Sequence, residues 1–421
     1  MPTETKLRNI EEISPRSTFS QKEKLKSLAF TSLGHFSNDF TLLLFSLLIV
    51  YYSQDYGISL ALLGAVAIIY NVISGLLSTP IGSYADKTGQ YRALIAIGIA
   101  IIGVAVIIFA LSFEFSHYVL PLMIISAVVI GTGQAFYHPL GASVLRVTHE
   151  AKTSSALGIN GAFGSVGRSV LPVLLVPMII MYGEFHSLLF IAGYLFIAAL
   201  IIFLGLSFIK PQNGSIDRKA TNPSDDKLGQ EGIERYEKAI FILVLIVFIR
   251  AMFLTGTTTY ISEYLVSRVH SDIIMSYIMA ISFVTAVAGQ PIFGRITEIK
   301  GGKFSIAVTS VLSTIFFILF MLSGSNVILD TIMYASFVFM GFTGFPVLLG
   351  YVSQIVPKKV ATKSNGLVWG LGNTVGGSVG LAIMSIVLFF KISLIDTMWI
   401  MVIFGVISCL FLPLLPKKAK A

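Results

Sequence analysis

The sequence predicts an all-α membrane protein with twelve membrane-spanning helices in two six-helix bundles related by a pseudo-twofold axis. Hydrophobic residues make up 55% of the 421 residues and charged residues only 12%, whereas a soluble domain carries roughly 25% charged residues. Twelve apolar runs are each long enough to cross a bilayer, which takes about 20 residues. A charged, glycine-rich loop occurs twice, 212 residues apart, and such a repeat indicates an internal duplication.

The apolar runs fall into two groups of six, separated by a long polar stretch. We expect spanning helices near 28–52, 58–82, 92–112, 118–143, 154–182, 187–209, 239–265, 272–295, 303–323, 326–354, 363–389 and 392–414. The first run is too long for a signal peptide, so we expect it to remain as a helix. The predicted parts are a tail (1–27), an N-terminal bundle (28–209), a linker (210–238), a C-terminal bundle (239–414) and a tail (415–421).

Basic residues lie mostly on one side of the predicted membrane. Of the 29 Lys and Arg residues, 25 fall in the two tails, the linker and alternate loops, and only Arg268 and Lys391 fall in the loops of the other side. Cytoplasmic loops carry such an excess. We therefore expect a multi-pass protein of the cell membrane with both termini cytoplasmic. The net charge of +8 is then loop charge in contact with the lipid bilayer, and no nucleic-acid partner is expected.

The repeated loop joins the second and third apolar runs of each group. In the first copy, its characteristic residues are Gly82, Asp86, Lys87, Gly89 and Arg92; in the second copy they are Gly294, Glu298 and Gly301. In each copy an acidic residue follows the first glycine by four positions and precedes another glycine by three. We expect both copies to act as gating loops.

The form Gly-x-x-x-Asp-Lys/Arg-x-Gly-x-x-Arg, in a chain of twelve spanning helices, resembles the major facilitator superfamily. The resemblance covers the whole chain and implies two bundles around a central cavity, which rock to give alternating access. It also implies that Asp86 and Arg92 join a charge network against the end of helix 11, and that the protein is a monomer. The chain departs from the family at Gln90, where a basic residue is usual, and in the second copy at Glu298 and Ile299.

Two shorter motifs point to a narrower group. Helix 1 carries His35-Phe-Ser-Asn38-Asp39, and helix 4 carries Phe136-Tyr-His138-Pro-Leu-Gly-Ala142. Both resemble the fosmidomycin-resistance group of this superfamily. Arg168 stands in helix 5 where that group has an uncharged residue, so the identity of the substrate is not carried over.

Few ionisable side chains lie inside the predicted helices. A charge at the centre of a membrane helix costs about 2.5–3.5 kcal/mol on insertion scales, so such residues are functional candidates. Asp39 in helix 1 lies near mid-membrane, with His35 one turn away and His138 in helix 4. A carboxylate and two imidazoles can exchange protons near neutral pH. We expect Asp39 to be the proton-coupling residue, with His35 and His138 in second place.

Arg168 in helix 5 and Arg250 in helix 7 lie at a similar depth, and two interpretations stay open. In the first, the two guanidinium groups clamp an organic anion (a carboxylate, phosphate or phosphonate), because arginine binds such groups through paired donors. In the second, Asp39 and Arg168 form a buried structural ion pair. Neutral contacts to the substrate are expected from Gln134, Tyr137, Tyr260, Trp369 and Asn373. Glu263, near the outer end of helix 7, is expected to be interfacial.

The residues and the resemblance together predict a secondary active transporter that is coupled to protons and carries a small organic anion. The resemblance implies alternating access, and export in the manner of the resembled group is the leading expectation. Uptake of an organic anion or metabolite by proton symport is the alternative, and a substrate-sensing receptor on a transporter fold is a weaker one. An enzyme is not expected, because the chain lacks a convergent set of nucleophile or metal ligands, and no cofactor is expected. Transport driven by ATP is not expected either, because the chain has no phosphate-binding loop. No metal site is expected either, because the histidines are scattered along the sequence.

Overall fold

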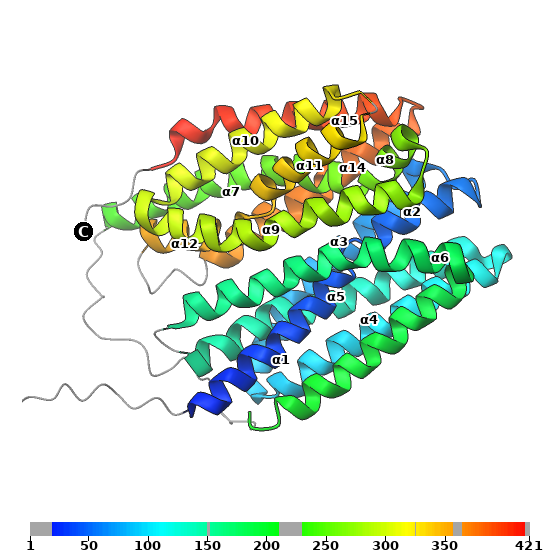
Figure 1. Ribbon diagram of the computed structural model, residues 1–421. Coiled ribbons are helices and arrows are strands. Elements are labelled where there is room, and N and C mark those ends of the chain that lie inside the picture. The colour runs from blue at the N-terminus through cyan, green and yellow to red at the C-terminus, as the bar shows by residue number, and fades with distance from the viewer. Residues whose placement is uncertain (1–18, 150–151, 210–229, 325, 357–363, 417–421) are drawn as a thin grey trace, which may run out of the picture.

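A computed structural model describes residues 19–149, 152–209, 230–324, 326–356 and 364–416 (Figure 1). Those residues are almost entirely helical, and no strand occurs among them. The predicted tails at 1–18 and 417–421 and the linker at 210–229 lie outside the described residues. We call residues 19–209 the N-half and residues 230–416 the C-half.

Each half is a bundle of long helices. The helices of the N-half are α1 (Gln21–Phe40), α2 (Leu44–Gln54), α3 (Leu60–Thr88), α4 (Tyr91–Glu114), α5 (Val119–His149) and α6 (Thr153–Gly205). Those of the C-half are α7 (Gln230–Thr259), α8 (Ile261–Val269), α9 (Asp272–Lys300), α10 (Gly302–Leu322), α11 (Val327–Gly341), α12 (Gly344–Ile355), a π-helical segment (Leu367–Val375) with α14 (Gly376–Phe389), and α15 (Leu394–Leu410). Short 3₁₀ turns cover Ser116–Tyr118 and Leu412–Leu414.

The described residues contain eleven helices that are long and apolar enough to cross a membrane. One of them, α6, has 53 residues and would be about 80 Å long at 1.5 Å per residue, which is far more than one crossing needs. It turns back at Gly183, where φ is 74° and ψ is 167°. Counted on either side of that turn, α6 supplies helices 5 and 6. The described part of the chain then holds twelve spanning helices, and the predicted fold class is confirmed.

Among the described residues, three of the long helices are interrupted, which the apolar runs did not predict. Helix 1 breaks between α1 and α2, helix 7 between α7 and α8, and helix 10 between α11 and α12. A break leaves backbone carbonyls without helical partners, so other groups must bind them. Thr41 donates to Asn38 O at 2.8 Å, and Arg250 donates to Gly341 O at 2.9 Å. Discontinuous helices of this kind form the substrate and ion sites of many transporters.

The internal duplication is visible in one repeated contact. A methyl group added to Gly82 on α3 would lie 3.6 Å from Pro139 Cβ on α5. A methyl group added to Gly294 on α9 would lie 3.6 Å from Pro346 Cβ on α12. Helices 2 and 4 therefore meet in the N-half as helices 8 and 10 meet in the C-half.

The N-half and the C-half lie side by side (Figure 1). We call the end with Phe19 and Pro416 the termini end, and the end with α2 and α8 the opposite end. Between the halves, α6 packs against α9 and α3 packs against α14. At the opposite end Ser46 Oγ lies 3.1 Å from Ser262 Oγ, and Tyr260 OH donates to Leu60 O at 3.0 Å. Hydrogen bonds therefore join the halves at the opposite end.

Helix 1 begins earlier than its apolar run. α1 begins at Gln21, and Ser20 and Glu23 form a capping box at its start. The hydroxyl and carboxylate satisfy backbone N–H groups that the first helical turn leaves free. Seven residues of the predicted tail are therefore helical, because capping and not hydrophobicity decides where this helix starts.

Candidate functional site

Asp39 is the centre of a buried charge cluster. It lies in the last turn of α1, just before the break in helix 1. Its Oδ2 atom is 3.4 Å from His35 Nε2 and 3.6 Å from Arg168 Nε, and its Oδ1 atom is 3.7 Å from His138 Nε2. The four side chains come from α1, α5 and α6. We call them the Asp39 cluster.

Asp39 is buried, with a relative exposure of 2%, so its charge needs compensation from nearby groups. Asn38 Nδ2 donates to Asp39 Oδ1 at 3.1 Å, and the Arg168 guanidinium brings positive charge to Oδ2, with Nε at 3.6 Å. His138 is the most open member of the cluster, with 36% of its side chain exposed against 10% for His35. The cluster is therefore accessible mainly at His138.

Asn160 on α6 fixes the orientation of His35 and was not predicted. Its Oδ1 atom lies 2.7 Å from His35 Nδ1. Because an amide oxygen only accepts, Nδ1 carries a proton and Nε2 faces Asp39. Asparagines are common in helix contacts, and the partner is 125 residues away in sequence, so no spacing signal could have identified it.

Tyr137, predicted as a substrate contact, is hydrogen-bonded within this network in the described conformation. Its hydroxyl donates to Thr31 O at 2.6 Å and lies within 3.1 Å of the Asn160 amide. It is 2% exposed. The side chain thus links α1, α5 and α6 beneath His35.

The two arginines approach adjacent residues at the break in helix 10. Arg250 Nη2 donates to Gly341 O at 2.9 Å, and Arg168 Cζ lies 5.7 Å from the centroid of the Phe342 ring. Arg250 is 7% exposed, and among the described acidic residues none forms an ion pair with it within 4.0 Å. A buried cation at the end of α11 is stabilised by the helix dipole, and it keeps capacity for an anion.

The structure shows the contact on which the second interpretation of the arginines depends, because Asp39 and Arg168 form a buried pair. The Arg168 guanidinium also lies near Phe342 of the C-half, next to the carbonyl of Gly341 that accepts from Arg250. The anion clamp of the first interpretation stays a prediction.

The other predicted neutral contacts are more dispersed. Gln134 is buried on α5. Tyr260 is fully buried at the break in helix 7, where it donates to Leu60 O of the N-half. Trp369 and Asn373 lie in the π-helical segment of helix 11. The structure thus brings the ionisable candidates of the N-half together in one cluster. The predicted neutral contacts lie apart from one another, on several helices of both halves.

The comparisons with known proteins agree with this architecture. The family model described as Major Facilitator Superfamily matches residues 31–383 and 243–421. The chain belongs to the major facilitator superfamily. It is therefore a membrane transporter and not an enzyme, as the sequence predicted.

Two curated relatives share about a quarter of their residues with this transporter. The fosmidomycin resistance protein of Escherichia coli (strain K12) is 23% identical over 403 residues, which cover 95% of this chain and 93% of that protein. The uncharacterized MFS-type transporter YfnC of Bacillus subtilis (strain 168) is 23% identical over 320 residues, covering 74% of this chain and 75% of that one. The resemblance to the fosmidomycin-resistance group is confirmed.

Solved structures of low sequence identity share the fold. A bacterial homologue of the human lysosomal transporter Spinster, inward-facing and unoccupied, gives a TM-score of 0.73 at 15% identity, covering 94% of this chain and 98% of that one. The peptide transporter POT in complex with sulfate gives a TM-score of 0.72 at 14% identity, covering 93% of both chains. Both likenesses concern the fold alone.

The superfamily loop has its partners inside its own half in this conformation. Asp86 Oδ1 accepts from Tyr91 OH at 2.7 Å, and Arg92 Cζ lies 4.3 Å from the centroid of the Phe203 ring. Gly89 ends α3 with φ 66°, a left-handed conformation that glycine adopts without strain. The contact of Asp86 and Arg92 with the end of helix 11 stays a prediction for another state of the transport cycle.

The second copy of the loop is simpler. Glu298 pairs with Arg295 at 2.8 Å on the surface, and Gly301 ends α9 with φ 89°. Gly302 N donates to Gln354 Oε1 at 2.8 Å, which ties the loop to α12. Both copies therefore keep a glycine at the turn, and the first copy keeps more of its charges.

The structure corrects the expectation that the histidines are scattered. One ligand atom each of His35, Asp39 and His138 lie within 4.8 Å of one another. Two imidazoles and a carboxylate are also a set of zinc ligands. Arg168 brings positive charge to the same carboxylate oxygen, so the cluster balances the Asp39 charge with its own side chains.

Gly164 leaves the room that the Asp39 cluster occupies, and this gives a matched test. A methyl group at Gly164 would lie 2.6 Å from His35 Nε2 and 2.7 Å from Asp39 Oδ2, whereas one at Gly158, on the same helix, has nothing within 4 Å. We expect Gly164→Ala to destabilise the protein by about 1–3 kcal/mol and to impair transport. Gly158→Ala should change stability by less than about 1 kcal/mol. Thermal unfolding and flux of the two variants check this, and equal behaviour would contradict it.

Proposed function

We propose that this transporter is a proton-coupled secondary carrier of the cell membrane, acting as a monomer with both termini cytoplasmic, and that it exports a small organic anion. The observation that carries the proposal is the Asp39 cluster, in which one buried carboxylate has two imidazoles and a guanidinium within 3.7 Å. Buried ionisable groups in membrane helices mark ion and substrate pathways. The opposite end is then extracellular.

For the second candidate function, proton-coupled uptake of the anion, the coupling step would be an exchange of partners at Asp39. When Arg168 is bound to Asp39, the carboxylate is ionised and its charge is balanced. When Arg168 turns toward an anion beside Phe342, Asp39 loses that balance and a proton is the natural replacement. His138, the most open member, lies between Asp39 and water and can relay the proton.

Arg168 and Arg250 supply the anion site of this proposal. They approach the break in helix 10 from the two halves, at Phe342 and Gly341. An anion held between them would contact both bundles, which is where a carrier must sense its substrate. Its substrate class would be carboxylates, phosphates or phosphonates, because guanidinium groups bind these through paired donors.

The direction of transport is proposed from the name of a relative. The coupling between substrate binding and proton binding tests it. The name of the Escherichia coli relative, a resistance protein, favours export. The shared guanidinium favours the second candidate, proton-coupled uptake, because an anion that takes Arg168 away from Asp39 raises the affinity of Asp39 for a proton. Export in exchange for protons instead requires that substrate and proton exclude each other, for example through direct contact of the substrate with Asp39.

The test is the proton balance of substrate binding. Purified protein in a weakly buffered solution with a pH indicator receives candidate anions (phosphonates, sugar phosphates, short carboxylates). Proton release on binding supports exchange and export, whereas proton uptake supports symport. Binding of an anion without any proton change in the wild type would remove the proposed coupling at Asp39.

A further inference from the structure

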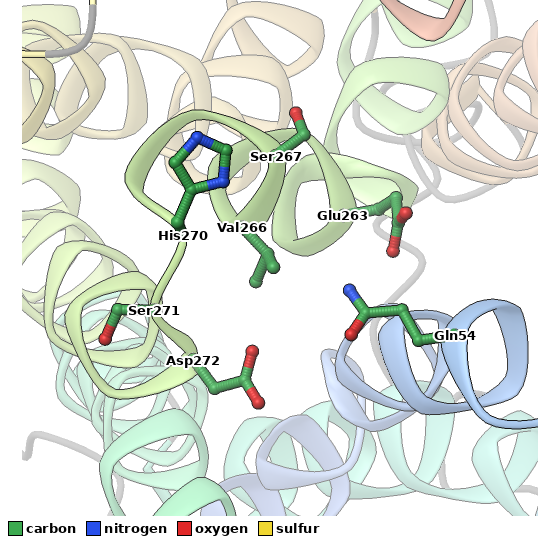
Figure 2. A pocket seen from close by; sticks show the side chains of 7 residues that line it. All are labelled: Gln54, Glu263, Val266, Ser267, His270, Ser271 and Asp272. Carbon is green, nitrogen blue, oxygen red and sulfur yellow. The ribbon is translucent and has the colours of Figure 1, made fainter.

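A pocket of about 400 Å³ opens at the opposite end, where the halves meet (Figure 2). Gln54 of α2 lines it from the N-half, and the other lining residues come from α8 and the start of α9. Its size suffices for several waters, each of which takes about 30 Å³. Figure 2 shows Glu263 of α8 and Gln54 of α2 on facing helices at the rim of this pocket.

Glu263 takes part in the contacts that close this end. Ser53 Oγ of α2 donates to Glu263 Oε2 at 3.0 Å. The neighbouring contacts between the halves, those of Ser46 with Ser262 and of Tyr260 with Leu60 O, involve hydroxyl and carbonyl groups. Among the described residues, Glu263 is therefore the only carboxylate that joins the halves here by a hydrogen bond.

The surroundings of Glu263 are poor in positive charge. Asp272 at the start of α9 lines the same pocket and adds negative charge. Arg268, on its own helix, pairs with Asp330 at 2.9 Å. His270 lines the same pocket and is exposed.

Glu263 lies outside the membrane-spanning segment of helix 7. The candidate span covers Glu237–Thr259, about 34 Å at 1.5 Å per residue, which is already enough to cross the hydrocarbon core, and α8 follows it. Burial raises the pKa of Glu263, and the charge of Asp272 adds to this, while the hydrogen bond from Ser53 opposes it.

We propose that Glu263 is a proton-binding residue of the outer gate, and that its protonation favours the closed arrangement of α2 against α8. In the closed gate the side chain is half-buried, and in an open gate it would be hydrated, with the ordinary glutamate pKa of about 4.3. The closed gate therefore binds the proton more tightly. Acidification must favour closure, and this effect is lost as the pH rises through the pKa of the closed state.

The proposal goes beyond the role of Asp39 and does not depend on it. It rests on the alternating access of the superfamily and on the proposed orientation, in which the opposite end is extracellular, and it needs no knowledge of the substrate. Between the two pH limits, the ratio of closed to open molecules changes by the ratio of the acid dissociation constants of Glu263 in the open and closed gates. Binding of an extracellular proton to Glu263 would then favour closure of the outer gate.

The experiment measures the width of the gate by paired spin labels. Met181 in the N-half and Ile328 in the C-half are exposed, at 69% and 73%, near the opposite end. Both are replaced by cysteine in a Cys409→Ser background, and distances are recorded in lipid nanodiscs at pH 4.5 and pH 7.5. Glu263→Gln imitates the protonated form, and Glu114→Gln, an exposed carboxyl at the same end, is the matched control.

We expect the population with the longer distance to fall several-fold at pH 4.5 in the parent and in Glu114→Gln. Glu263→Gln should show mainly the shorter distance at both pH values. The proposal is overturned if the parent shows no pH dependence, or if Glu263→Gln keeps the pH dependence of the parent. Asp272→Asn should reduce the pH effect without removing it, because it lowers the repulsion and leaves the titrating group.

Discussion

Asp39→Asn is expected to abolish proton-driven transport while binding of the anion survives. Asparagine has nearly the same shape as aspartate but cannot gain or lose a proton at this pH. Because Asp39 no longer holds Arg168, the guanidinium is free for the anion, and the affinity should be kept or raised. Flux driven by a pH gradient should fall to the level of empty liposomes, measured beside equilibrium binding to the purified variant.

The control is Asp396→Asn, which makes the same chemical change in an exposed side chain at the start of α15. It should transport like the wild type. Folding needs its own check, because removing one partner of a buried ion pair leaves an uncompensated charge and can cost about 3–5 kcal/mol. Thermal unfolding and anion binding of the purified Asp39→Asn variant supply this check. If the variant is folded and still binds the anion while flux is lost, the loss is functional, whereas unchanged flux in Asp39→Asn means that the residue is structural.

Arg168→Gln and Arg250→Gln are each expected to weaken binding of the anion about 10- to 150-fold. Hydrogen bonds to charged groups contribute about 1.5–3 kcal/mol, and each 1.4 kcal/mol is a factor of ten in affinity. Titration calorimetry or competition binding on purified protein measures the change. Arg168→Gln should also change the number of protons taken up or released on binding, whereas Arg250→Gln should leave that number unchanged.

Arg295→Gln is the matched control for the arginine variants, since Arg295 is a surface residue with 71% of its side chain exposed. If neither Arg168→Gln nor Arg250→Gln changes the affinity for the anion, the proposed anion site is wrong and the two arginines are structural counter-charges. If only Arg250→Gln weakens binding, Arg168 belongs to a structural pair with Asp39, and the second interpretation of the sequence holds.

The fold could be predicted because it depends on features that a sequence displays directly. Apolar runs of sufficient length are visible one by one, and the duplication is visible in the spacing of two loops. The breaks in helices 1, 7 and 10 could not be predicted, because each depends on groups from elsewhere that bind the freed carbonyls, such as Arg250 at Gly341. The turn at Gly183 was placed within a few residues, since a short polar stretch marks it.

The site was predicted in part, for a related reason. Asp39, Arg168 and Arg250 could be singled out one at a time, because a charge in an apolar run is conspicuous. His138 joins Asp39 over a separation of 99 positions, and Asn160 orients His35 over 125, so tertiary packing alone brings them together. From the sequence, Glu263 is expected only to be interfacial. Its contact between the halves could not be predicted, because its hydrogen-bond donor Ser53 lies in the other half, 210 positions away.

The most direct test of proton-coupled anion transport is a flux measurement in proteoliposomes. A pH-sensitive dye is enclosed, no gradient is imposed, and phosphonates, sugar phosphates and short carboxylates are added one at a time. We predict that at least one anion moves protons through the wild type and that Asp39→Asn stops this movement. If no anion moves protons while neutral or cationic compounds do, the anion site at Arg168 and Arg250 is contradicted.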